Sequence, residues 1–257
     1  ITIFNDGIAV LNARVFLPRL LNSTNASLVG SSCEEDFIVT GDDVARIVLI
    51  KSNGDGTFGA QQQLFDEPWF NIWGLGIADF DNDGDCDFVT GGNDDNIHYY
   101  RQTGSLAFAP AANVGTYTSS GYSMDVAVED FNNDGNFDFV ISGNDNSLFL
   151  FSGRGDGSFV RSQLQNMPSS GRGKDAADVN GDGNADLVVG TGTSNLYFYG
   201  GNGDGTFKPS QTIAHGFSDL YGVTLADYDN DGLIDIVASD SNGAGALYFF
   251  KGKAKVE

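Results

Sequence analysis

Four segments of this chain share one nine-residue acidic pattern, Asp-x-Asp/Asn-x-Asp-Gly-x-x-Asp. The copies begin at Asp79, Asp130, Asp178 and Asp227, so successive copies are 51, 48 and 49 residues apart. Positions 1, 3, 5 and 9 of every copy carry a side-chain oxygen: Asp79, Asp81, Asp83 and Asp87; Asp130, Asn132, Asp134 and Asp138; Asp178, Asn180, Asp182 and Asp186; Asp227, Asp229, Asp231 and Asp235. Several carboxylates in one tight loop repel one another unless a hard cation lies among them. The pattern predicts about four calcium sites.

Two other interpretations of these loops fit the sequence less well. Asp, Asn and Gly are common in surface turns, but four copies in register argue against coincidence. An EF-hand needs a Glu at position 12 and flanking helices, whereas position 12 is here Thr90, Ile141, Val189 or Ala238 and the flanks are apolar runs of strand length. The glycine at position 6 permits the sharp turn around an ion. We therefore expect each loop to join two strands, with its ninth-position Asp opening the second.

The pattern belongs to a longer repeat of about 50 residues. An aromatic run such as SLFLF or NLYFY follows each second strand, then a Gly-rich turn such as NGDGTF, which favours a further hairpin. Asp36 matches Asp87 one period earlier, but positions 1, 3 and 5 of that first repeat fall on Leu28, Gly30 and Ser32, so no calcium is expected there. The repeats run over about 11–65, 66–115, 116–166, 167–214 and 215–257, with 1–10 added to the last.

Repeated four-stranded antiparallel units of this length predict an all-β protein, a β-propeller of about five blades forming a single domain over residues 1–257. An open solenoid has the same period. Closure is favoured because the last repeat lacks a clear fourth strand, which the strand-like segment 1–10 can supply, removing the free edges. The tail KAKVE is the alternative source of that strand.

Over residues 30 to 255 the motifs resemble the FG-GAP and VCBS repeats, calcium-loop blades also found in integrin alpha propellers and in some fungal and bacterial lectins. The resemblance implies one further calcium ligand in each loop, the backbone carbonyl of position 7, here Asp85, Asn136, Asn184 and Leu233. Integrin propellers have seven longer blades, so the fold and the metal carry over better than any partner.

Composition and short motifs favour an extracellular setting. The formal net charge of −22 argues against nucleic acid and anionic membranes as partners, and no apolar run is long enough to span a bilayer. Calcium loops of this kind fill where calcium is near millimolar. Asn22 and Asn25 begin glycosylation sequons. Cys33 and Cys86 occupy corresponding loops of adjacent repeats and form either a disulfide or two buried thiols.

Aromatic side chains are expected on the face opposite the calcium loops, where they are either glycan platforms or wedges between blades: Trp69, Trp73, Tyr122, Phe217 and Tyr221. The sequence predicts a secreted or cell-surface binding module whose leading ligand is carbohydrate. The alternatives are adhesion to an extracellular protein and a domain of a carbohydrate-active lyase or hydrolase. No catalytic residue is assigned, although Arg172 and Lys174 on an expected innermost strand are the place to look for one.

Overall fold

A computed structural model describes residues 37–40, 46–51, 53, 57, 59–60, 62–66, 72–104, 107–116, 123–143, 145–240 and 245–253. These residues form antiparallel strands and no helix, and no segment among them is a helix suited to crossing a membrane. Alternating or fully apolar runs rich in Val, Ile, Phe and Tyr make the strands, and Gly, Asn and Asp make the turns between them.

Three sheets have four strands each. Their strands are β4 (Ile72–Ala78), β5 (Asp87–Gly92), β6 (Asn96–Tyr100) and β9 (Ala112–Thr116); β10 (Ser123–Glu129), β11 (Asp138–Gly143), β12 (Leu148–Gly153) and β13 (Phe159–Gln163); β14 (Gly171–Ala177), β15 (Asp186–Thr191), β16 (Asn195–Tyr199) and β17 (Gln211–His215). Neighbouring strands follow one another in the sequence, except that β6 pairs with β9 and a short hairpin intervenes between these two strands.

The remaining sheets are smaller. They comprise β18 (Leu220–Ala226), β19 (Asp235–Asp240) and β20 (Ala246–Phe250); β1 (Phe37–Thr40), β2 (Arg46–Ile50) and β3 (Gln62–Asp66); and the short hairpin β7 (Gln102–Gly104) and β8 (Ala107–Phe108).

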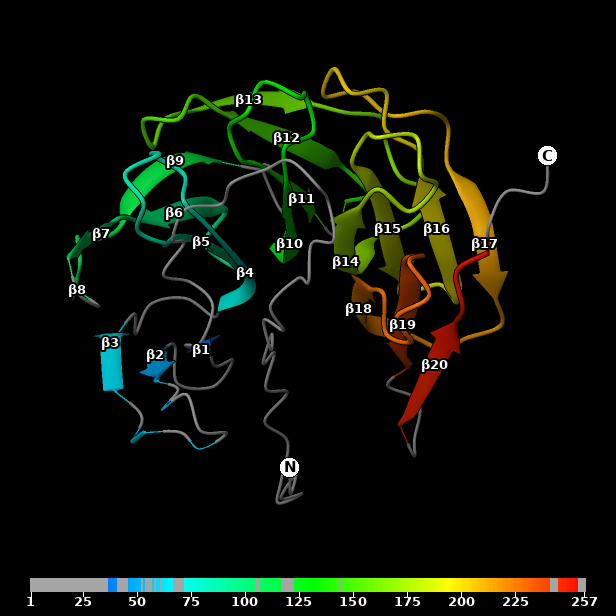
Figure 1. Cartoon of the computed structure of the whole chain (residues 1–257), viewed down its shortest axis with the longest axis horizontal. Coiled ribbons are helices and arrows are strands. Elements are labelled where there is room, and N and C mark those ends of the chain that lie inside the picture. The colour runs from blue at the N-terminus through cyan, green and yellow to red at the C-terminus, as the bar shows by residue number, and fades with distance from the viewer. Residues whose placement is uncertain are drawn as a thin grey trace.

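Four sheets form the blades of a β-propeller. Their innermost strands β4, β10, β14 and β18 pack side by side in that order, and the sheets fan out around a common centre (Figure 1). The predicted all-β propeller is confirmed, and four blades are found among the described residues where about five were predicted. The difference lies in the N-terminal repeat, which contributes the short strands β1 to β3 and contacts β4 less extensively than the inner strands contact one another.

Two predictions about the ends of the chain concern residues that the structure does not describe. The segment 1–10, predicted to close the last blade, lies outside the described residues, as does most of the KAKVE tail. The single-domain assignment and the repeat boundaries also stay predictions.

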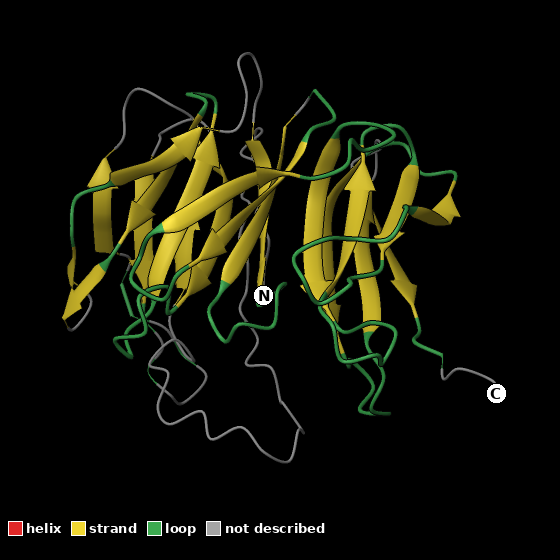
Figure 2. Cartoon of the chain, turned by 90° about the horizontal axis from the view of Figure 1, so that it is seen from above, coloured by secondary structure: helices red, strands yellow, loops and turns green. Residues whose placement is uncertain are grey.

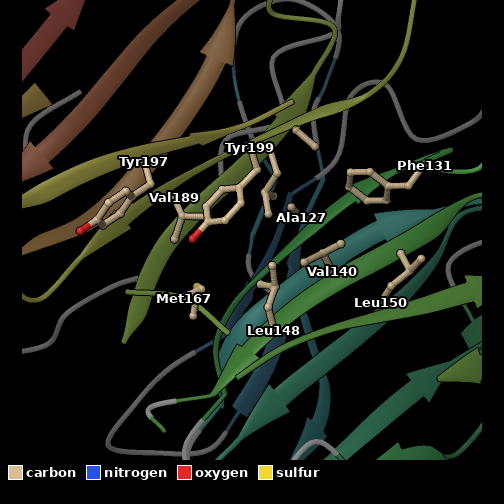
Figure 3. Close-up of a cluster of buried hydrophobic side chains, with 11 residues drawn as sticks. Ala127, Phe131, Val140, Leu148, Leu150, Met167, Val189, Tyr197 and Tyr199 are labelled. Carbon is tan, nitrogen blue, oxygen red and sulfur yellow. The ribbon is translucent and has the colours of Figure 1, made fainter. Parts of the chain in front are cut away.

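The core lies between successive blades. The second strands β5, β11 and β15 are buried at every residue, because a neighbouring sheet covers each face. Figure 3 shows one such layer, in which Val140, Leu148 and Leu150 face Val189 and Tyr199 of the next blade. Each fully buried side chain of this size contributes about 1.5–3 kcal/mol. The layers hold the blades, and therefore the loops at their ends, at fixed spacing.

The acidic loops share one end of the molecule. Each connects the first and second strand of a blade, and Figure 2 shows the strands standing side by side with their connections gathered at the two ends. The ninth-position residues Asp87, Asp138, Asp186 and Asp235 are the first residues of β5, β11, β15 and β19. The prediction that this Asp opens the second strand is confirmed.

Candidate metal centres

The four acidic loops are named metal loops 1 to 4 and comprise residues 79–87, 130–138, 178–186 and 227–235. In each, the carboxylate at position 1 accepts two backbone N–H groups from positions 5 and 6. In metal loop 2, Asp130 accepts them from Asp134 at 3.1 Å and Gly135 at 2.8 Å. Gly135 has a φ of 87°, which suits glycine far better than other residues. The same pair of bonds recurs in metal loops 1, 3 and 4.

The carboxylate at position 5 is also held by its own loop. One of its oxygens accepts the backbone N–H of position 7, as Asp134 does from Asn136 at 2.8 Å. Equivalent bonds hold Asp83, Asp182 and Asp231. The backbone of each loop is therefore wrapped around its acidic side chains by hydrogen bonds within the loop itself.

The ninth-position carboxylate of each metal loop is buried, and we call it the clamp carboxylate: Asp87, Asp138, Asp186 and Asp235. Asp138 is 0% exposed. One of its oxygens accepts the N–H of Phe131 at position 2 of the loop, at 3.0 Å, and the other accepts the N–H of Gly153 at the end of β12, at 2.9 Å. Both contacts recur around Asp87, Asp186 and Asp235. This residue thus ties each loop to the third strand of its blade.

Burial makes the clamp carboxylates of metal loops 1, 2 and 3 reluctant to ionise, because it raises the pKa of each. It raises the pKa of Asp87 to about 6 and that of Asp138 to about 7, despite the N–H groups that favour the charged form. The pKa of Asp186 is raised for the same reason. A cation in the loop would offset this cost, so the buried carboxylates fit a metal-binding role.

Two loops bring three carboxylates close enough for one ion. The ligand oxygens of Asp79, Asp81 and Asp87 lie within 4.8 Å of one another, and so do those of Asp227, Asp229 and Asp231. Metal loops 2 and 3 carry Asn132 and Asn180 at position 3, where an amide oxygen replaces a carboxylate. Oxygen donors of this kind are those that calcium prefers.

In three of the metal loops, carboxylates form ion pairs with a Lys or Arg side chain. The Arg101 guanidinium pairs with Asp81 and, at 3.0 Å, with Asp83. The Lys251 ammonium pairs with Asp229 and Asp231, and the Lys208 ammonium lies 3.3 Å from Asp182. Within the described ranges, no such ion pair is found at metal loop 2.

The sequence did not predict that these basic residues pair with the metal loops. Arg101 and Lys251 each follow the third strand of their blade by one residue, after Tyr100 and Phe250, and that shared position was the available signal. Their carboxylate partners lie about 20 residues earlier, so only the hairpin geometry brings the charges together.

Two of the predicted ligand residues, Trp73 and Tyr221, lie at the end of the blades opposite the metal loops. Trp73 and Tyr221 both lie six residues before position 1 of a metal loop, where the pairing of the innermost strand shifts register. Arg172 holds the same place in β14. Such bulges redirect side chains at the ends of strands.

Arg172 and Tyr221 meet between adjacent blades. The guanidinium carbon lies 4.4 Å from the centre of the Tyr221 ring, and its Nε lies 2.7 Å from Asp219. Tyr221 is 37% exposed. Lys174, by contrast, is 0% exposed and its ammonium donates to the backbone oxygens of Asp125 and Arg172, so it is a buried structural group.

Phe217 does not join this surface. Its ring is 8% exposed and packs edge-on against Tyr248 and Phe250 in the core. Trp69 and Tyr122 lie outside the described residues, as do Asn22, Asn25 and the first-repeat loop. Cys86 is disulfide-bonded; Cys33, the other cysteine of the chain, is not among the described residues, so their pairing stays a prediction.

The fold and its repeated loops define a β-propeller of acidic-loop repeats. The family profile of the FG-GAP-like repeat matches residues 79–141, 130–189 and 178–238, which together cover more than half of the chain. The chain belongs to the FG-GAP-like repeat family, and the resemblance predicted from the motifs is confirmed. No match is found among curated proteins.

The chain is also similar to solved structures. A lectin of Agrocybe aegerita, studied for its specific recognition of non-reducing terminal N-acetylglucosamine, is 19% identical with a TM-score of 0.54 over 83% of this chain. This chain spans 62% of that lectin's length. The computationally designed Ika4 protein is 13% identical with a TM-score of 0.47, covering 74% of this chain and 99% of the designed one. At such identity, the likeness to the lectin shows the fold alone.

Proposed function

We propose that this protein is a calcium-stabilised extracellular binding module whose ligand is a carbohydrate. The observation that carries the calcium assignment is the repeated loop, in which a clamp carboxylate is buried without a compensating charge of its own. The lectin fold of a structural neighbour supports the ligand class. Membership of the FG-GAP-like repeat family supports both.

Calcium would be held by the side-chain oxygens of positions 1, 3, 5 and 9 and the carbonyl of position 7 in each metal loop. When bound, the ion supplies the positive charge that lets the clustered carboxylates ionise together. With free calcium tenfold above a site's dissociation constant, each site adds about 1.4 kcal/mol to stability. Four sites together would contribute several kcal/mol, which is a substantial share of the stability of a typical domain.

An extracellular location follows from the same argument. Sites of this type are filled where calcium is near millimolar and stand largely empty in a resting cytosol. The disulfide at Cys86 favours an oxidising compartment as well.

Carbohydrate binding is assigned to the end of the blades opposite the metal loops. Trp73 and Tyr221 recur there at equivalent places, and an aromatic ring accepts the C–H face of a sugar. The neighbouring Arg172 and Asp219 offer directional donors and acceptors for hydroxyl groups. Phe217 is left out of this proposal because its ring is buried.

A glycan array tests the proposal directly. The protein is screened in millimolar calcium and in EDTA, beside the variants Trp73→Ala and Phe137→Ala. Phe137 is a matched control, because it is a 38% exposed aromatic within metal loop 2, at the other end of the blades. We expect specific glycan binding in calcium that Trp73→Ala abolishes and Phe137→Ala preserves. No binding to any glycan by the folded protein would refute the carbohydrate assignment and favour a protein ligand.

A further inference from the structure

Adjacent metal loops are joined by a pair of side-chain amides. Asn82, at position 4 of metal loop 1, donates its Nδ2 hydrogen to Oδ1 of Asn136, at position 7 of metal loop 2, over 2.9 Å. The Nδ2 group of Asn136 in turn donates to Oδ1 of Asp134, also at 2.9 Å. A continuous chain of hydrogen bonds thus runs from the turn of one loop to a predicted calcium ligand of the next.

The same chain recurs one blade further on. Asn133, at position 4 of metal loop 2, donates to Asn184, at position 7 of metal loop 3, over 3.1 Å. Asn184 donates to Asp182 at 3.0 Å. The two amide pairs join residues 54 and 51 positions apart in the sequence. Because the arrangement repeats with the blades, it is a feature of the architecture rather than of one loop.

A glycine covers each amide pair. A Cβ atom on Gly155 would lie 2.3 Å from both Asn136 Oδ1 and Asn82 Nδ2. Gly203 approaches the second pair equally closely, at 2.3 Å from Asn184 Oδ1 and 2.5 Å from Nδ2 of Asn133. Both glycines have positive φ, 70° and 74°. Each Gly-Asp-Gly turn therefore lies directly over an amide pair and restricts where its two side chains can move.

The chain of amides ends at metal loop 3. Its position 4 is Gly181, which has no side chain, and position 7 of metal loop 4 is Leu233, which cannot form the bond. Asn230, at position 4 of metal loop 4, makes no inter-loop hydrogen bond within the described ranges. Among the described residues, metal loops 1, 2 and 3 are thus linked, and metal loop 4 lacks the link.

We propose that the asparagines at positions 4 and 7 are positioning residues that couple metal loops 1, 2 and 3, so that these loops bind calcium as a linked set while metal loop 4 binds independently. The proposal rests on the calcium function proposed above. Binding at one loop fixes its position-5 carboxylate, which orders the amide that the neighbouring loop uses. By linkage, the neighbour's affinity must change by the same factor in return. One net hydrogen bond supports a coupling of about two- to tenfold in affinity.

Each loop has its own reporter for a test by heteronuclear NMR. The position-6 glycine amide donates to the position-1 carboxylate, so its signal follows occupancy of that loop alone: Gly84, Gly135, Gly183 and Gly232. Calcium is titrated into the chelator-stripped full chain. Asp134→Asn weakens metal loop 2 while retaining an acceptor. We expect this variant to raise the calcium midpoint about two- to tenfold at Gly84 and Gly183, and to leave Gly232 unchanged.

A second substitution separates coupling from a general loss of structure. Asn82→Gly deletes one amide, tolerates the φ of 57° at that position, and reproduces the residue that metal loop 3 already has there as Gly181. In the Asn82→Gly background, Asp134→Asn should no longer shift Gly84 but should still shift Gly183. Asn230→Gly, with a φ of 60° at the same loop position, is the matched control and should change neither response.

The outcomes distinguish the two proposals. The coupling is overturned when Asp134→Asn affects Gly84 no more than Gly232, or when the shift at Gly84 survives in Asn82→Gly. Calcium binding without either effect leaves the proposed function standing. Absence of any response to millimolar calcium at all four glycines overturns the proposed function, and the coupling with it.

Discussion

The clamp carboxylate should stabilise the blade whether or not calcium is bound. In Asp138→Ala, the N–H groups of Phe131 and Gly153 lose their partner inside the protein. An unsatisfied buried donor costs about 1–3 kcal/mol, so the two together predict a loss of about 2–6 kcal/mol. For a chain of this size that corresponds to a fall of roughly 4–24 °C in Tm.

Asp134→Ala provides the contrast, because Asp134 is exposed and also accepts a backbone N–H, from Asn136. Water can replace that exposed contact, so the expected loss in EDTA is below about 1 kcal/mol. In calcium, the same variant loses a metal site and should cost about 1.4 kcal/mol more when free calcium is tenfold above the dissociation constant.

Urea unfolding at 25 °C, in EDTA and in millimolar calcium, measures both variants beside the wild type. The reasoning predicts a large loss for Asp138→Ala under both conditions, and a loss for Asp134→Ala that calcium increases. Equal losses for the two variants in EDTA would refute the clamp argument, because burial would then make no difference.

Three further outcomes are expected. In EDTA, the stability of the wild type relative to Asp138→Asn should fall as pH rises from about 4 to 8, because the folded state keeps the Asp138 proton up to about pH 7 while the unfolded state releases it near 4. Urea titrations at several pH values measure this difference in the free energy of unfolding. A relative stability of the wild type that rises with pH would contradict the prediction. Gly76→Ala should cost about 1–3 kcal/mol in thermal unfolding, since its Cβ would lie 2.7 Å from a methyl group of Val126; an unchanged Tm would count against the close packing of β4 and β10. Lys251→Gln should tighten calcium binding at metal loop 4 several-fold, because the ammonium 3.1 Å from Asp231 competes with the ion. Calorimetry measures this affinity, and weaker binding in the variant would show that Lys251 supports calcium binding instead.

The sequence predicted what short-range patterns determine. The acidic loops, the strands around them and the ninth-position Asp at the start of each second strand follow from spacing and strand propensity, and the structure confirms them. The dual contact of that Asp was not predicted, because Gly153 lies 15 residues beyond Asp138 and meets it only once β12 has paired with β11.

Features that depend on how blades meet could not be predicted. The amides of Asn82 and Asn136 come together only through the packing of adjacent blades, and nothing local in the sequence marks them as partners. Phe217 was expected either to bind glycan or to wedge between blades, and its ring packs against aromatic residues of β20 in the core. The number of blades found among the described residues differs from the prediction for a similar reason, since the period gives the number of repeats and not how each repeat packs.

Metal content tests the central claim most directly. The chelator-stripped protein is dialysed against millimolar calcium, and bound calcium per chain is measured by elemental analysis beside a variant carrying Asp83→Ala, Asp134→Ala, Asp182→Ala and Asp231→Ala together. About four ions per wild-type chain, and few or none in the variant, is the result predicted from the four loops. A wild-type chain that is folded in millimolar calcium yet holds no bound calcium would contradict the account.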